Sequence, residues 1–356
     1  MYTAYDYIRN GILLARNTLL PRHKKLSQLM IYATNMCQSR CLHCSIWQKP
    51  HDFLSIDEIV SVMSSRCIGR HTTVGLEGGE FVLHPQAEEI MRWFRVNHPN
   101  YTLLSNCLAP EKVITLARRF RPRHLYVSLD GDRDTYRKMR GVDGYDKVMR
   151  VINELNGEIP LSLMFCLSPF NSFKDMEYAI AVANKHSIDI RIGIYGTMAY
   201  FDTKASMLQT EATAYASEIP ASIHSTQENF DFVTLYDQWR HGNLRLRCHS
   251  IMNSLVIHPD GNVPLCQNLG VTMGNIKEKS LDEIFNSEEN TRLQCRYSKD
   301  CNGCWINFHR KYDIILIRNL EKVLPKKIIE LFYGHYQWCG DSKQTYRNYL
   351  NEQIDR

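Results

Sequence analysis

Three cysteines near the N-terminus have the type and spacing to bind a metal cluster. Cys37, Cys41 and Cys44 form a C-x3-C-x2-C pattern on one short segment. Grouped thiolates select zinc or iron–sulfur clusters, and a structural zinc site usually has C-x2-C pairs and a fourth ligand nearby. Because no obvious fourth ligand accompanies these cysteines, the pattern favours a 4Fe–4S cluster with one iron open to a ligand that is not protein.

This triad resembles the cysteine motif of the radical S-adenosylmethionine (radical SAM) superfamily, and the resemblance covers roughly residues 25–310. In that family the open iron is chelated by S-adenosylmethionine (SAM). The resemblance implies that an electron donor of flavodoxin or ferredoxin type reduces the cluster, that SAM is cleaved to a 5′-deoxyadenosyl radical, and that this radical takes a hydrogen from the substrate. The protein would position the cofactor and exclude water.

Composition and charge limit the class of protein. The chain has 356 residues, 44% of them hydrophobic and 23% charged, which is typical of a globular protein with a large core. Its net charge of +5 is too small to indicate nucleic-acid binding. We find neither a signal-peptide pattern nor an apolar run of the ~18 residues that suggest a membrane span. We therefore expect a cytoplasmic protein whose twelve cysteines serve metal binding or catalysis.

Short apolar runs alternate with helical patterns between residues 29 and 196. Alternation of this kind predicts a parallel sheet covered by helices. Six units predict an α/β fold, a partial (β/α)6 TIM-type barrel, which radical SAM proteins share. The expected strands are 29–34, 73–77, 101–105, 124–129, 161–167 and 189–195, and the expected helices are 56–64, 85–96, 110–120, 145–155 and 173–186.

The triad follows the first predicted strand, so it belongs to the C-terminal mouth of the barrel, where such barrels bind ligands. Gly78, Gly79 and Glu80 follow the second strand. Glycines allow a ligand to approach the backbone closely. Alone they would indicate only a turn, but after the triad they resemble the family's GGE motif, which receives the amino group of SAM.

Polar residues also follow the next two strands: Ser105 and Asn106, then Ser128 and Asp130, with Arg140 farther along. By the family resemblance Ser128 and Asp130 contact the ribose or carboxylate of SAM. Arg140 has the fork geometry to pair with a carboxylate. A helix cap for Asp130 and a solvated charge for Arg140 are equal alternatives.

His43 stands where the family often has an aromatic residue against adenine, although it could instead only cover the cluster. No catalytic side chain is identified. The predicted SAM-binding residues are His43, Gly78, Gly79, Glu80, Ser105, Asn106, Ser128, Asp130 and Arg140.

A second group of cysteines lies in the C-terminal third: Cys248, Cys266, Cys301 and Cys304. An Asp-Gly turn at residues 260–261 predicts a hairpin with Cys248 and Cys266 on facing strands. Four thiolates can complete a 4Fe–4S cluster or a zinc site.

This layout resembles the SPASM/twitch extensions of radical SAM enzymes, which carry auxiliary clusters. The last part of the seven-cysteine SPASM pattern is missing, so the shorter twitch form with one auxiliary cluster is favoured, giving two 4Fe–4S clusters and SAM as cofactors. Whether Cys295 or Cys339 ligates a cluster stays open. The expected segments are a helical lead-in (1–28), the barrel (29–196), a linker (197–247), a SPASM/twitch domain with a β-hairpin and a helix (248–310), and a helical tail (311–356).

Two enzymatic functions compete. The four-cysteine layout resembles twitch-type alcohol dehydrogenases, so the main prediction is an oxidoreductase that dehydrogenates or epimerises a small polar molecule such as a sugar or aminocyclitol. The alternative is a maturase of a ribosomally synthesised peptide, forming a thioether or carbon–carbon crosslink or an epimer. A non-enzymatic metal scaffold is disfavoured by the GGE and Ser-Leu-Asp-Gly runs. The basic, partly apolar tail is expected to pack on the barrel, with membrane-surface contact as the weaker alternative.

Overall fold

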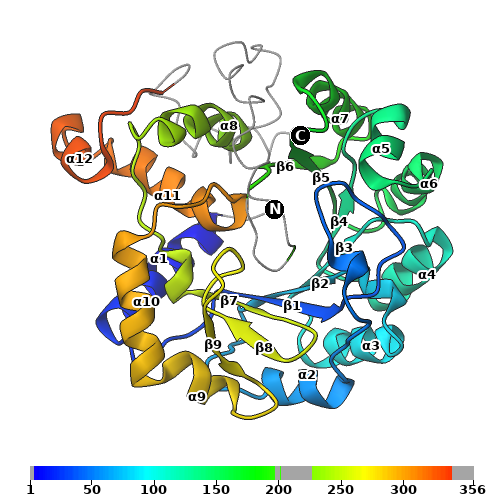
Figure 1. Ribbon diagram of the computed structural model, residues 1–356, viewed down its shortest axis with the longest axis horizontal. Helices are drawn as coiled ribbons and strands as arrows, with labels where there is room; N and C mark the ends of the chain where they lie inside the picture. The colour runs from blue at the N-terminus through cyan, green and yellow to red at the C-terminus, as the bar shows by residue number, and fades with distance from the viewer. Residues whose placement is uncertain (1–3, 197–200, 202–226, 339–356) are drawn as a thin grey trace.

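The computed structural model describes residues 4–196, 201 and 227–338 (Figure 1). A curved sheet of seven strands forms its centre, in the order β6-β5-β4-β3-β2-β1-β7 with parallel neighbours throughout. The predicted α/β partial barrel is therefore confirmed, and it has one strand more than expected. The strands are β1 (Gln28–Thr34), β2 (Thr73–Gly78), β3 (Tyr101–Ser105), β4 (His124–Ser128), β5 (Leu161–Leu167), β6 (Asp189–Ile194) and β7 (Ser254–Ile257).

Helices cover the outer face of this sheet because alternate strand residues are apolar. On β1, Leu29, Ile31 and Ala33 belong to the hydrophobic core, and the residues between them point to the other side of the sheet. The surrounding helices are α2 (Ile56–Met63), α3 (Ala87–Asn97), α4 (Pro110–Phe120), α5 (Arg133–Arg140), α6 (Tyr145–Leu155) and α7 (Phe173–Lys185), with short 3-10 helices η1 (Ile46–Gln48) and η2 (Phe81–Leu83).

Helix α5 was not predicted, because its sequence is mostly charged. Asp132 starts it by accepting a hydrogen bond from the Thr135 backbone N–H, a standard N-cap. Tyr136 and Met139 are its buried apolar side chains. A helix with so narrow an apolar stripe gives a weak periodic signal.

The C-terminal part folds beside the open edge of the barrel, but the predicted hairpin was wrong in detail. Strand β7 lies before the Asp-Gly turn and joins the barrel next to β1. The antiparallel hairpin is formed by β8 (Asn262–Pro264) and β9 (Thr272–Asn275), so neither Cys248 nor Cys266 lies on a strand. The remaining elements are α8 (Gln227–Arg240), η7 (Ser250–Met252), α9 (Leu281–Asn286), α10 (Glu288–Asp300), α11 (Asn307–Leu320) and α12 (Lys326–Tyr333).

Both ends of the described chain pack on this body. Helix α1 (Ala4–Leu19) is tied down by Asn17, whose side-chain amide donates to Lys25 O and Met252 O at 2.8 and 3.0 Å. In α11, Ile314 and Ile317 are buried, as expected for a tail that packs on the protein. Among the described residues, no helix combines the length and the apolar character needed to cross a membrane.

Candidate active site

The loop that carries the triad is held by the backbone of the Gly-Gly-Glu segment. The N–H of Gly79 donates to Thr34 O, and the N–H of Glu80 donates to Met36 O, both at 2.7 Å. A Cβ on Gly79 would lie 2.3 Å from Met36 O, so a side chain cannot be accommodated there. Gly78 has a φ of +130°, which also favours glycine. The two glycines thus position the triad loop, and their contact with SAM stays a prediction.

The C-terminal end of α5 supports the same loop from the other side. The N–H of Arg40 donates to Arg140 O at 2.8 Å, and the N–H of Leu42 donates to Met139 O at 2.9 Å. Ser39 Oγ donates to the same Arg140 carbonyl at 3.2 Å. The cysteines therefore lie on a loop whose backbone is fixed at several points.

A buried ion pair lies beside the triad. Arg140 Nε donates to Asp130 Oδ2 at 2.5 Å, and Arg140 Nη1 lies 3.7 Å from Cys41 Sγ. Burial raises the pKa of the Cys37 and Cys44 thiols to about 12, while the charge of Arg140 acts in the opposite direction. A metal must displace these thiol protons to bind, and the guanidinium favours the resulting thiolates.

Glu80, Ser105 and Asn106 form one buried hydrogen-bonded group. The Glu80 carboxylate accepts from Ser105 Oγ at 2.8 Å and from the Asn106 backbone N–H at 2.7 Å. Burial raises the pKa of Glu80 to about 7. The amide of Asn106 in turn lies 3.6 Å from Cys37 Sγ. The structure therefore brings these three predicted residues to the triad.

Two other predicted residues lie nearby on different elements. Burial lowers the pKa of His43 to about 4, so the ring is neutral at pH 7. It makes an edge-to-face contact with Tyr195, after β6, at a centroid distance of 6.3 Å. Ser128 ends β4 and is buried. Their contacts with SAM remain predictions.

Sequence reasoning missed residues on the inner face of the barrel. The hydroxyl of Tyr32 on β1 donates a hydrogen bond to Gln267 Oε1 at 2.8 Å, and its ring stacks on His258. These two contacts join the barrel to the C-terminal part. Glu77 alternates with core residues on β2, and burial raises its pKa to about 7. Cys166 on β5 is half-buried and lies outside the hydrophobic cluster. The period-two pattern of the strands was the signal that could have identified these side chains.

The four cysteines predicted for the second site are gathered, although they come from separate segments. Electrostatic interactions link Cys248 with Cys266 and Cys304, and link Cys266 with Cys301 and Cys304. Burial raises the pKa of Cys266 to about 12. Four soft thiolate donors suit an iron–sulfur cluster. Among the described residues, no three His, Cys, Asp or Glu side chains are arranged to hold a single metal ion.

The spare cysteines differ in position. Cys295 lies on α10 and interacts with the buried Lys24, whose ammonium donates to Thr291 Oγ1 on the same helix at 2.9 Å. Cys339 lies outside the described residues.

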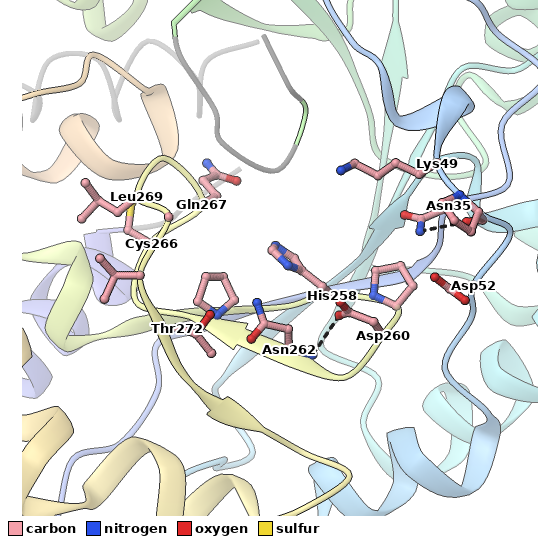
Figure 2. A pocket seen from close by; sticks show the side chains of 15 residues that line it. Asn35, Lys49, Asp52, His258, Asp260, Asn262, Cys266, Gln267, Leu269 and Thr272 are labelled. Atoms are coloured by element: carbon pink, nitrogen blue, oxygen red, sulfur yellow. Dashed lines mark hydrogen bonds between the residues drawn. The ribbon is translucent and has the colours of Figure 1, made fainter.

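A cavity of about 390 Å³ lies between the segments that flank the triad along the chain and the C-terminal region, where Cys266 lines it (Figure 2). Asn35 and Lys49, on either side of the triad along the chain, line one part of it. His258, Cys266 and Gln267 line the part that belongs to the C-terminal region. A molecule bound there would touch the loop after β1 and the C-terminal region, including Cys266.

Comparison with known families agrees with this geometry. The model of the radical SAM superfamily matches residues 31–182, and that of the SPASM iron–sulfur cluster-binding domain matches residues 248–305. The chain belongs to the radical SAM superfamily and carries a C-terminal SPASM domain. It is thus an enzyme of the SPASM subclass, for which SAM and iron–sulfur clusters are the implied cofactors.

Relatives extend over most of the chain. The antilisterial bacteriocin subtilosin biosynthesis protein AlbA of Bacillus subtilis is 22% identical over 312 residues, which are 78% of this chain and 68% of AlbA. The crystal structure of Streptococcus suis SuiB bound to S-adenosylmethionine has a TM-score of 0.60 at 13% identity, over 82% of this chain and 73% of SuiB. Native anSMEcpe with bound AdoMet has a TM-score of 0.55 at 14% identity, over 83% of this chain and 99% of its own. These structures establish the fold.

Proposed function

We propose that this radical SAM SPASM enzyme modifies a ribosomally synthesised peptide. The observation that carries the proposal is the similarity of 78% of the chain to AlbA, a bacteriocin biosynthesis protein. The fold is also that of SuiB, solved bound to the precursor peptide SuiA, and of anSMEcpe, solved with a Cp18Cys peptide. These relatives favour the peptide alternative over the small polar substrate that was the main prediction from sequence.

The cavity lined by Asn35, Lys49 and the C-terminal region has suitable chemistry for a peptide. Its volume of about 390 Å³ is that of a ligand site, and the amides of Asn35, Asn262 and Gln267 line it. An amide side chain both donates and accepts, so it can bond the N–H and C=O groups of an extended backbone. Lys49, Asp52 and Asp260 also line it, so charged groups of both signs accompany the amides. A peptide residue in this cavity would lie beside the triad loop.

The residues present also fit the implied cofactors. Cys37, Cys41 and Cys44 supply three thiolates and leave one iron of a 4Fe–4S cluster for SAM, which when bound supplies the 5′-deoxyadenosyl radical. Glu80 offers a carboxylate for the SAM ammonium group, and Arg140 offers a positive charge beside Cys41. The other predicted SAM contacts keep their assignments from sequence.

Cys248, Cys266, Cys301 and Cys304 supply enough thiolates to saturate a second 4Fe–4S cluster. With no iron left open, this group does not bind SAM and is suited to receive the electron of a substrate radical. The proposed enzyme therefore holds two clusters, and a flavodoxin or ferredoxin supplies the first electron.

The test uses a short precursor peptide encoded beside this gene, with deuterium at its Cα and side-chain carbons. Reconstituted enzyme, SAM and a reductant should transfer deuterium to 5′-deoxyadenosine, and mass spectrometry should show that a crosslinked peptide has lost two hydrogens. A product that has exchanged one deuterium for one hydrogen, with no other change in mass, would indicate epimerisation. If the peptide is unchanged while deuterated sugars or aminocyclitols give labelled 5′-deoxyadenosine, the peptide proposal is wrong and the small-molecule prediction is restored.

A further inference from the structure

Arg310, in the first turn of α11, is a fully buried arginine beside the second cysteine group. Its Nε donates to the backbone carbonyl of Cys304 at 2.9 Å, and its Nη1 donates to the carbonyl of Arg247 at 3.3 Å. Asp313, one turn along the helix, pairs with Nη1 at 3.4 Å. Buried arginines normally require such partners.

The two carbonyls belong to different cysteine segments. One is that of Cys304 itself, and the other is that of the residue before Cys248. These segments are far apart in sequence, and neither holds the other through a strand. The guanidinium therefore bridges two of the loops that must stay together for four thiolates to converge.

One nitrogen of this guanidinium lacks a hydrogen-bond partner among the described residues. Nη2 of Arg310 is buried and makes no hydrogen bond to any part of the chain that the structure describes. A buried unpaired donor costs about 1–3 kcal/mol, more when charged, so its presence indicates a missing acceptor.

The surrounding charges identify the type of acceptor. The thiols of Cys304, Cys248 and Cys301 and the carboxylate of Asp313 interact electrostatically with the guanidinium, so all four groups lie in its surroundings. Asp313 already pairs with Nη1. Sulfur atoms of the second cysteine group are therefore the acceptors that remain for the unpaired nitrogen.

We propose that Arg310 is a positioning residue of the auxiliary cluster: it clamps two ligand segments together, donates an N–H to a cluster or cysteine sulfur, and offsets the cluster's negative charge. This inference rests on the auxiliary cluster of the proposed function but not on a peptide substrate. Hydrogen bonds to sulfur and nearby positive charge raise the reduction potential of iron–sulfur clusters. The planar guanidinium of arginine can donate to two carbonyls and a sulfur at once. A lysine ammonium, which is a compact point charge, makes these contacts less well.

The experiment uses the full chain with Cys37, Cys41 and Cys44 replaced by Ala, so that only the auxiliary cluster is present. In this background, Arg310→Gln with Asp313→Asn removes both charges and leaves no unpaired ion. The matched control is Arg318→Gln with Asp231→Asn. That pair is also buried and joins the same helix to α8.

Iron content and the midpoint potential, followed by electron paramagnetic resonance, are the measurements. We expect the Arg310 pair variant to lose iron selectively or to keep it with a more negative potential, while the Arg318 pair variant matches the parent. A variant with Arg310→Lys keeps the positive charge but loses the bridge between the two segments. Its midpoint potential should therefore lie closer to the parent value than its iron content does.

Equal iron loss in both pair variants would mean general destabilisation and would overturn the inference, as would a full iron content with an unchanged or more positive potential. A parent that binds no iron would refute the auxiliary cluster itself, and the peptide-labelling assay would still test the substrate independently.

Discussion

Both cysteine groups must stabilise buried thiolates, but the chain assembles the two groups differently. The triad lies on one loop held by backbone hydrogen bonds to the segment after β2 and to the end of α5. The second group draws its thiols from three segments of the C-terminal region. Each is accompanied by a buried Arg–Asp pair: Arg140 with Asp130 at 2.5 Å, and Arg310 with Asp313 at 3.4 Å. A local motif needs its loop fixed, whereas a dispersed one also needs a side chain that bridges its parts.

The largest difference expected between the groups concerns SAM cleavage. Replacing Cys37, Cys41 and Cys44 with Ala should abolish 5′-deoxyadenosine formation, because no open iron remains to bind SAM. Chromatography after incubation with SAM and dithionite measures this. Cleavage at the wild-type rate would show that the triad is not the SAM site.

Loss of the second group should separate radical formation from product formation. The variant Cys301→Ala with Cys304→Ala should still form 5′-deoxyadenosine but should give little oxidised or crosslinked product, since the substrate radical lacks an electron acceptor. Both compounds are measured in one quenched reaction. Wild-type levels of both would make the second group structural, and loss of both in a folded protein would mean that the two groups are not independent.

Iron content tests the same separation. We expect about eight irons per reconstituted chain, from two 4Fe–4S clusters, and about four in the triad variant. A wild-type iron content near four, with stoichiometric zinc, would show that zinc replaces the auxiliary cluster. An iron content near twelve would indicate a third cluster that Cys295 or Cys339 helps to ligate.

The buried pair beside the triad should contribute strongly to stability. Arg140→Met leaves Asp130 buried and uncompensated, which should lower the free energy of unfolding by about 3–5 kcal/mol. Urea unfolding of the metal-free protein measures the change. The control is Arg133→Met, which breaks the exposed pair with Asp146 and should change the free energy of unfolding far less, because water and salt screen exposed ion pairs. Equal losses in the two variants would contradict the importance of burial at this site.

The smallest effect concerns the inner-face carboxyl group of Glu77. Its folded-state pKa is about 7, above the ordinary 4.5, so the folded protein holds this proton more tightly and loses stability as pH rises from about 4.5 to 7. Glu77→Gln should therefore be more stable than wild type at pH 8, by at most about 3 kcal/mol because the side chain is partly exposed, and the gain should vanish near pH 4.

Urea unfolding at both pH values, with the exposed Glu89→Gln as control, measures the difference between variant and wild type. A gain that is the same at pH 4 and pH 8 would show that the titration of Glu77 is not its cause.

Much of the barrel could be predicted because its signals are local. The strands at residues 101–105 and 161–167 and the helices at 110–120 and 145–155 begin and end where apolar periodicity predicted them. Helix α5 was missed because its apolar stripe is narrow, with Tyr136 and Met139 as its buried apolar side chains in a mostly charged sequence. Strand β7 was assigned to a hairpin because only its pairing with β1 shows that it belongs to the barrel.

The sequence by itself determined the chemistry of the triad, since three thiolates within one loop are close in any fold. It also predicted the four thiols of the second group, because their types and spacing resemble a known pattern. Only the tertiary structure decided what surrounds them. The pairing of Arg140 with Asp130, the bridge made by Arg310 and the contact of Tyr32 with Gln267 all join residues from separate elements. Local spacing carries no information about such contacts, because they form only when packing excludes water and forces buried polar groups to find partners.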